Sequence, residues 1–306
     1  MQDKTIIYKH IVPCNLSEKI RLPDYIIQNI PTIQSRNSAK KAIKKGLILL
    51  DGQQVESSRF VKSEQIIEHI ADIYVTKSNL KLKLNIIYED NHIAAVYKPA
   101  GISVSGNYYK TIQNAVAYNL KLSPEQDALP TALPVHRLDN PTSGILLIAK
   151  TQNAAINLGK QFQEKLIRKS YSAVVIGTPK QEGVISTTID NKDAVTRFKV
   201  IKTVNSLKYT FMSLVELYPE TGRTHQLRIH MAKAGFPITG DKLYSPEELL
   251  FKGKGLFLSA VKIEFKHPYS NENMILETDI PQKFISLLKR EQARWDKVIK
   301  SQSQKK

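Results

Sequence analysis

Short apolar runs bounded by turn residues recur along the chain, and they predict strands. Residues 145–149 are uniformly aliphatic, follow Ser143-Gly144 and stop at Lys150, which predicts a strand buried in a core. Residues 85–89 and 92–98 flank Asp90-Asn91, and this pattern predicts a hairpin. Further strands are predicted over residues 169–177, 197–204, 207–217, 256–265 and 274–277.

Helical spacing of apolar residues appears between these strands. Thr151 can cap a helix over residues 152–165, and Ala155, Leu158 and Phe162 share one face of it. Further helices are predicted over residues 112–120, from Thr221-Gly222 to Gly235, as a short capping-box helix from Ser245, and from Pro281 onward. The pattern therefore predicts a β-rich domain with helices inserted between its strands.

The first eighty residues have a different organisation and predict a small separate module. A short helix is predicted around residues 25–30, and Ser35 can cap a second one whose Ala39, Ala42 and Ile43 form a buried face. Gly46 is placed to end that helix, residues 47–50 form a predicted strand, and Asp51-Gly52 is a hairpin signal. The side of the second helix opposite its buried face is basic, with Arg36, Lys40, Lys41, Lys44 and Lys45 around it.

This order of helix, glycine, strand and Asp-Gly turn resembles the RNA-binding module named after ribosomal protein S-four, over residues 17–75. We expect the module to span residues 17–76, after an N-terminal extension of residues 1–16. Its basic helix face would contact RNA phosphates. The ordinary alternative is a lysine face that is merely solvated. Residues 77–84, with alternating lysines, are expected to be a linker.

Charge points to a polyanionic partner. The chain has 45 Lys and Arg against 28 Asp and Glu, a net charge of +17, which attracts nucleic acid or an anionic membrane surface. No apolar run approaches the roughly 18 residues of a membrane span, and the N-terminus lacks the pattern of a signal peptide. The single cysteine, Cys14, cannot form an internal disulfide, which indicates a reducing compartment. We therefore expect a cytoplasmic monomer that binds RNA and no membrane.

The candidate site residues His136, Arg137 and Asp139 lie within four consecutive positions. The turn residues Asn140-Pro141 follow, and then the predicted buried strand, so Asp139 is expected on a loop that a strand holds in place. The ordinary interpretation is a surface ion pair between Arg137 and Asp139. A metal site is not expected, because His225 and His230 are five residues apart and point to different sides of a helix.

Several segments together resemble the RluA-type family of large-subunit ribosomal pseudouridine synthases. They are His-Arg-Leu-Asp at 136–139 with Thr-Ser-Gly at 142–144, Lys-Ser-Tyr-Ser-Ala at 169–173, Thr-Gly-Arg-Thr-His-Gln-Leu-Arg at 221–228, Gly-Phe-Pro-Ile-Thr-Gly-Asp-Lys-Leu-Tyr at 235–244, and Lys-Pro-Ala-Gly at 98–101. The departures are Asn140-Pro141, where a charged or polar pair is more usual, and the lack of a histidine in 104–106. The resemblance implies an α+β fold, a mixed, mainly antiparallel β-sheet with flanking helices at residues 85–290, plus the small N-terminal α/β module. Residues 291–306 would be a basic tail.

The resemblance also implies roles for individual residues. Asp139 would be the catalytic residue, Tyr171 would stack on the target base, and Arg223 would pair with Asp139. Arg137 would fill the space left by the flipped nucleotide or contact a phosphate, and we expect His136 and Arg228 to contact RNA as well.

The expected reaction is the isomerisation of uridine, which needs neither a cofactor nor a metal. An ionised carboxylate would act as a nucleophile or as a base on the sugar. An opposing arginine would keep it charged in a sheltered pocket. We expect structured RNA as substrate, 23S ribosomal RNA first and transfer RNA as the alternative. A non-catalytic RNA-binding assembly factor and a general basic scaffold are the two other hypotheses.

Overall fold

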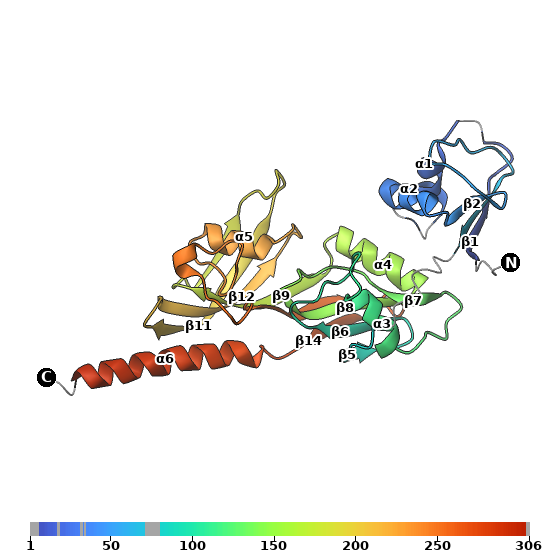
Figure 1. Cartoon of the computed structure of the whole chain (residues 1–306). Coiled ribbons are helices and arrows are strands. Elements are labelled where there is room, and N and C mark those ends of the chain that lie inside the picture. Colours follow the sequence, from blue (N-terminus) through green and yellow to red (C-terminus); the bar gives the residue numbers. More distant parts are fainter. Residues whose placement is uncertain (1–5, 17–18, 31–32, 34, 71–79, 304–306) are drawn as a thin grey trace. The chain divides into compact units, whose positions relative to one another are not determined.

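The computed structural model describes residues 6–16, 19–30, 33, 35–70 and 80–303 (Figure 1). The chain divides into two compact units, Met1–Ser78 and Asn79–Lys306. The first three residues of the predicted linker, 77–79, lie outside the described residues, as do Ser17 and Lys305-Lys306. Each unit is described by itself below.

Unit 1 is a small sheet with two helices. Its elements are β1 (Ile6–Ile11), α1 (Leu22–Asn29), α2 (Arg36–Lys44), β2 (Ile48–Leu50), β3 (Gln53–Gln54) and β4 (Ile66–Ile70). The strands pair antiparallel in the order β1-β4-β2-β3. β1 lies within residues 1–16, which we expected to be an extension. That expectation was wrong, because β1 is hydrogen-bonded to β4 as part of the sheet.

Helix α2 begins and packs as its sequence predicts. The Ser35 hydroxyl accepts a hydrogen bond from the Ser38 N–H at 3.1 Å, which satisfies an otherwise unpaired donor of the first turn. Ala39, Ala42 and Ile43 are buried, and the lysines of the opposite side are exposed. This helix therefore attaches to the core of the unit by one face and presents its basic face to solvent.

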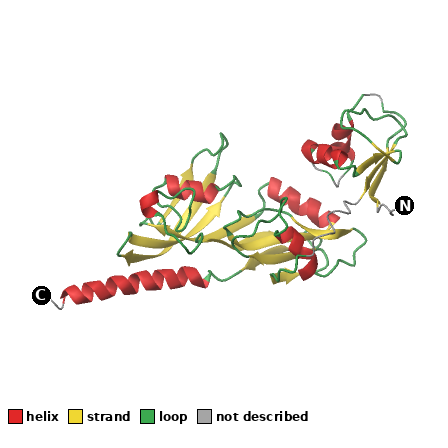
Figure 2. Ribbon diagram, viewed as in Figure 1, coloured by secondary structure: helices red, strands yellow, loops and turns green. Residues whose placement is uncertain are grey.

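Unit 2 is built on one ten-stranded sheet, shown in yellow in Figure 2. Its strands are β5 (Asn85–Glu89), β6 (Ile93–Lys98), β7 (Ala128–Pro134), β8 (Ser143–Thr151), β9 (Arg168–Ile176), β10 (Glu182–Ser186), β11 (Val195–Ser206), β12 (Thr210–Pro219), β13 (Leu258–Lys266) and β14 (Asn273–Glu277). The order is β10-β11-β12-β9-β13-β8-β6-β5, with β7 on β8 and β14 on β13. Within the described ranges, β8 and β13 pair in parallel and the other neighbours are antiparallel, so the mixed, mainly antiparallel prediction is confirmed.

Helices cover both faces of each half of this sheet. They are α3 (Ile112–Asn119), α4 (Gln152–Gln163), α5 (Gln226–Lys233) and α6 (Gln282–Ser303). All nine residues of β8 are buried. Its alternating side chains divide between two cores, Leu146 and Ile148 with residues of α3, and Ile145 and Leu147 with residues of α4. In the other half, α5 and α6 pack on opposite faces of β9 and β12 in the same manner.

The two halves meet where β8 runs beside β13. A Cβ atom added to Gly144, whose φ is +121°, would lie 2.1 Å from the Ala260 carbonyl oxygen. Only glycine allows the two backbones to approach this closely. Beside this contact the buried Ser143 hydroxyl donates to the Ser259 hydroxyl at 3.1 Å. Ser143 and Gly144 thus lie at the place where the two halves of the sheet join.

Three further expectations were wrong. The stretch from Ser245 forms only a 3-10 turn at Glu247–Leu249, because Pro246 keeps an extended backbone with ψ 148° and no side chain caps the turn. Residues 80–84 are not a free linker, since Leu84 is buried in the core with Leu80 and Leu82 against it. The expected boundary between domain and tail at residue 290 falls inside the helix that was predicted from Pro281 onward, since α6 runs to Ser303 and the buried Glu291 accepts a hydrogen bond from Ser206 at 2.8 Å. No described helix is both long and apolar enough to cross a membrane.

Candidate active site

Asp139 lies on the loop between β7 and β8, as the sequence predicts, and hydrogen bonds to the next residue, Asn140, hold this loop in place. The carbonyl oxygen of Asn140 accepts hydrogen bonds from the Lys98 ammonium at 3.1 Å and from the Gly101 N–H at 2.8 Å. Lys98 is fully buried and also donates to the carbonyls of Pro99 and Ile102. Burial lowers the pKa of Lys98 to about 8, against the opposing effect of the Asp139 charge. Lys98 therefore fixes the residue that follows Asp139.

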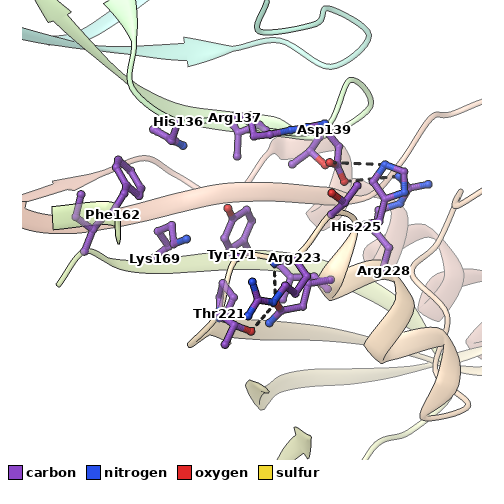
Figure 3. A pocket seen from close by; sticks show the side chains of 18 of the residues that line it. His136, Arg137, Asp139, Phe162, Lys169, Tyr171, Thr221, Arg223, His225 and Arg228 are labelled. Carbon is purple, nitrogen blue, oxygen red and sulfur yellow. Dashed lines mark hydrogen bonds and ion pairs between the residues drawn. The ribbon is translucent and has the colours of Figure 1, made fainter. Parts of the chain in front are cut away.

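Two cavities adjoin at Asp139. One has a volume of about 390 Å³ and runs past Tyr171 toward Phe162 (Figure 3). The other, of about 750 Å³, is bordered by Ser103, Ser105 and Lys242 among others. Both are lined by Arg137, Leu138, Asp139, His225 and Arg228. The Asp139 side chain is 16% exposed, so it is sheltered but open to a ligand in either cavity.

The cation beside Asp139 is Arg228, not Arg223. Arg228 Nη1 lies 3.6 Å from Asp139 Oδ2, and His225 Nε2 lies 3.8 Å from Oδ1 (Figure 3). Arg223 lines the same cavity, but its Nε donates to the Asp193 carbonyl oxygen at 3.1 Å. The predicted pair of Asp139 with Arg223 was therefore wrong. The reason is local: Arg223 precedes α5, whereas Arg228 lies in its first turn and is turned inward.

Arg228 is itself held by a second carboxylate. Its Nε and Nη2 donate to the two oxygens of Asp241 at 2.7 and 2.8 Å, and the side chains of both residues are almost fully buried. Burial disfavours the charge of Arg228, but the hydrogen bond and charge of Asp241, with the charge of Asp139, raise its pKa above the usual value. Arg228 is buried against two carboxylates and lines both cavities, so its expected contact with RNA stays a prediction.

His225 directly precedes the first residue of α5 and has an unusual backbone conformation. Its φ is 56° and its ψ 19°, in the left-handed region that non-glycine residues seldom adopt. The ring Nδ1 is hydrogen-bonded to the Tyr244 hydroxyl at 2.8 Å, which leaves Nε2 directed at Asp139. Strained backbone of this kind gathers at functional sites. Sequence reasoning missed Asp241 and Tyr244, although both stand in the motif quoted above.

Tyr171 projects from β9 into the wall of the smaller cavity (Figure 3). Burial and the nearby Asp139 carboxylate raise its pKa, so the phenol is neutral at physiological pH. A neutral phenol offers both an aromatic face and a hydroxyl donor. This placement suits the predicted stacking on a base, which stays a prediction.

The far end of this cavity is aromatic and basic. His136 lies against Phe162, with ring centroids 4.9 Å apart, and its Nε2 accepts a hydrogen bond from the Leu147 N–H at 3.0 Å. Burial, with the charge of Lys169, lowers the pKa of His136 to about 3. A neutral ring hydrogen-bonded to the backbone of β8 packs against Phe162 and still lines the cavity, so contact of His136 with RNA stays a prediction. Arg137, by contrast, is exposed at the rim.

The residues of unit 1 that we expected to bind RNA lie on one helix. Arg36 pairs with Asp24 through its Nε at 2.9 Å, so its charge is partly compensated. Lys40, Lys41, Lys44 and Lys45 are exposed, and their role in RNA binding stays a prediction. Among the described residues no group of three or more His, Cys, Asp or Glu is arranged to hold a metal ion.

Comparison with known proteins identifies the family to which the chain is similar. Residues 92–233 match the family model for RNA pseudouridylate synthase. An uncharacterized RNA pseudouridine synthase of Aquifex aeolicus is 34% identical over 88% of this chain and 93% of the relative. Ribosomal large subunit pseudouridine synthase C of Rickettsia bellii is 31% identical over 90% of this chain and 99% of the relative.

A solved structure supports the same assignment. Human RNA Pseudouridylate Synthase Domain Containing 1 superposes with a TM-score of 0.54 and 25% identity, covering 65% of this chain and 84% of the human chain. The chain therefore belongs to the RluA-type family of RNA pseudouridine synthases.

Proposed function

We propose that this protein isomerises uridine to pseudouridine in large-subunit ribosomal RNA, with Asp139 as the catalytic carboxylate. The observation that carries the proposal is the position of Asp139, partly open at the junction of two cavities with Arg228 at 3.6 Å. Ribosomal RNA as substrate is supported by relatives named ribosomal large subunit pseudouridine synthase C and D.

The reaction exchanges one bond to the sugar for another. The bond from C1′ to N1 breaks, a bond from C1′ to C5 forms, C5 loses a proton and N1 gains one. Asp139 can begin this exchange by attacking C1′ as a nucleophile or by removing the proton on C2′. Deuterium at C2′ slows only the second route when that step limits the rate, so it distinguishes the two.

The target base has to leave its stack to reach Asp139. Extruding a base costs about a few kcal/mol, and enzymes offset this by stacking and by hydrogen bonds to the base edge. Tyr171, which lines the smaller cavity, would be the stacking platform, and the exposed Arg137 would occupy the vacated position or bind a phosphate. Tyr171→Phe separates stacking from the role of the hydroxyl: RNA affinity is expected to persist, and turnover falls if the hydroxyl acts.

Unit 1 would increase the affinity for RNA and would take no part in the catalytic step. Four exposed lysines and Arg36 on α2 would contact phosphates, each contact adding to a salt-dependent, sequence-independent term. Replacing Lys40 and Lys44 by glutamine is expected to weaken RNA binding and to flatten its dependence on salt, with single-turnover chemistry at saturation unchanged.

The test uses the full-length protein and unmodified transcripts. Large-subunit ribosomal RNA and transfer RNA are incubated separately with the wild type and with Asp139→Asn, and pseudouridine is mapped by chemical probing. We expect modification of the ribosomal transcript by the wild type and none by Asp139→Asn, which should still bind RNA. Binding by the wild type without modification of either RNA would refute the enzymatic proposal, and modification of transfer RNA alone would refute the substrate.

A further inference from the structure

Two adjacent tyrosines stand out on the surface of unit 2. Tyr108 is 71% exposed and Tyr109 is 64% exposed, on the loop between β6 and α3. Exposed apolar side chains that adjoin one another can mark an interaction site, whereas single ones are common on protein surfaces. Lys110 follows them directly and is exposed as well.

The loop that carries these tyrosines, residues 103–111, is called the tyrosine loop below, and it is ordered by its own hydrogen bonds. The Asn114 side-chain amide donates to the carbonyls of Tyr108 at 3.2 Å and Tyr109 at 2.8 Å. Its two ends are bridged at Ser103 and Thr111, where the Ile112 N–H donates to the Ser103 carbonyl at 2.9 Å. The tyrosines are thus presented from a fixed backbone, which reduces the entropy lost on binding.

The base of the tyrosine loop is joined to the catalytic loop. The Asn140 side-chain amide donates to the Ser103 hydroxyl at 3.0 Å, and Asn140 directly follows Asp139. Ser103 and Ser105 line the larger cavity, which also contains Asp139. The exposed cations Arg137 and Lys242 line that cavity too. The tyrosine loop and the catalytic loop therefore border the same cavity, which two exposed cations also line.

We propose that Tyr108 and Tyr109 form a stacking platform for unpaired RNA bases next to the target uridine. Aromatic faces beside basic side chains are the combination that binds single-stranded RNA, because bases stack on the rings while the cations hold the phosphates. The larger cavity would receive the neighbouring nucleotide, and the smaller one the target. This proposal rests on the proposed function for the identity of the partner as RNA.

The test compares looped with fully paired RNA. Two labelled RNAs of equal length and charge are used, a hairpin with a single-stranded uridine loop and a blunt duplex, and affinity is measured at one fixed salt concentration. The proteins all carry Asp139→Asn so that no turnover occurs. In this background Tyr108→Ala/Tyr109→Ala is expected to bind the hairpin roughly 5- to 150-fold more weakly. The same protein should bind the duplex as the parent does.

Two controls separate stacking from other causes. Tyr108→Phe/Tyr109→Phe keeps both rings and should retain hairpin affinity, while Tyr118→Ala removes a tyrosine that is 52% exposed on α3 and should change nothing. Unchanged hairpin affinity in the double alanine variant would overturn the proposal. An equal loss on hairpin and duplex would also overturn it.

Failure of this proposal and failure of the proposed function give different results. If the active wild type modifies no RNA but the tyrosines still distinguish hairpin from duplex, the proposed function fails and the stacking platform stands. If the wild type modifies RNA and the tyrosines make no difference, only the platform fails.

Discussion

Replacing Arg228 by methionine tests the electrostatic core of the site. Arg228 joins Asp139 at 3.6 Å and Asp241 through two hydrogen bonds at 2.7 and 2.8 Å, with both Arg228 and Asp241 buried. Methionine fills a similar volume but leaves Asp241 buried without its cation. Breaking a buried pair in this way costs about 3–5 kcal/mol, which corresponds to a drop in Tm of roughly 6–20 °C for a unit of this size.

A double variant separates stability from catalysis. Arg228→Met/Asp241→Asn removes the stranded charge, and asparagine can still accept the hydrogen bond that the Leu243 N–H donates at 3.0 Å. We expect the double variant to recover most of the lost stability. Activity should stay low in both variants, because neither restores a cation beside Asp139.

Urea unfolding followed by Trp295 provides the assay for stability. This is the single tryptophan of the chain, and it lies on α6, which packs on β9 and β12 of the same unit. Single-turnover modification of RNA provides the second measurement. Arg223→Met is the matched control from the same motif; it loses one hydrogen bond to a carbonyl and should cost about 1 kcal/mol. Wild-type stability in Arg228→Met, or a larger loss in Arg223→Met, would refute the assignment of the pair.

Three other predictions follow from buried groups. The pKa of His136 is lowered to about 3, so between about pH 6.5 and pH 3 the unfolded chain binds more protons than the folded one, and the free energy of unfolding decreases as the pH is lowered, by at most about 1.4 kcal/mol per pH unit. His136→Gln should make the free energy of unfolding, measured in urea, depend less on pH in this range, and an unchanged dependence would contradict the reasoning. Gly144→Ala should cost several times the roughly 1 kcal/mol expected for Gly235→Ala, whose φ is also positive but which has open space, and equal losses of stability would disprove the close approach of β8 and β13. Lys98→Met removes three hydrogen bonds to carbonyl oxygens, and Asn140 keeps only the one from the Gly101 N–H, so stability should fall by about 1–3 kcal/mol and turnover should fall too, because Asn140 is held less firmly; wild-type turnover would argue against a positioning role.

The local sequence pattern was sufficient to predict elements whose apolar positions or capping residues match the environment that they have in the fold. The aliphatic run in β8 is buried on both faces, and Thr151 caps α4 by accepting from the Ala154 N–H at 3.2 Å, as expected. β10 was missed because it lies at the end of the strand order with largely exposed residues, so it has no continuous apolar run. β1 was missed because its partner, β4, lies about sixty residues away.

The site was predicted as a set of segments but not as a set of contacts. Asp139 and Tyr171 line one cavity as expected, whereas the choice between Arg223 and Arg228 was wrong. Both arginines belong to one short motif, and which of them turns inward depends on the left-handed backbone at His225, where α5 begins. That conformation depends on tertiary contacts, among them the hydrogen bond with Tyr244, so a local pattern cannot reveal it.

The geometry of the sheet explains why Asp139 can be both charged and accessible. The loop with Asp139 precedes β8 in one half of the sheet, while Arg228 comes from α5, which packs on the other half. The two halves meet at β8 and β13, where Gly144 lets the backbones touch. A carboxylate at such a junction receives a buried cation from across it and still opens to the cavities between the halves. Because Asp139 and Arg228 come from different halves, the residues that join the halves at β8 and β13, as well as those that line the cavities, set the distance between the two groups.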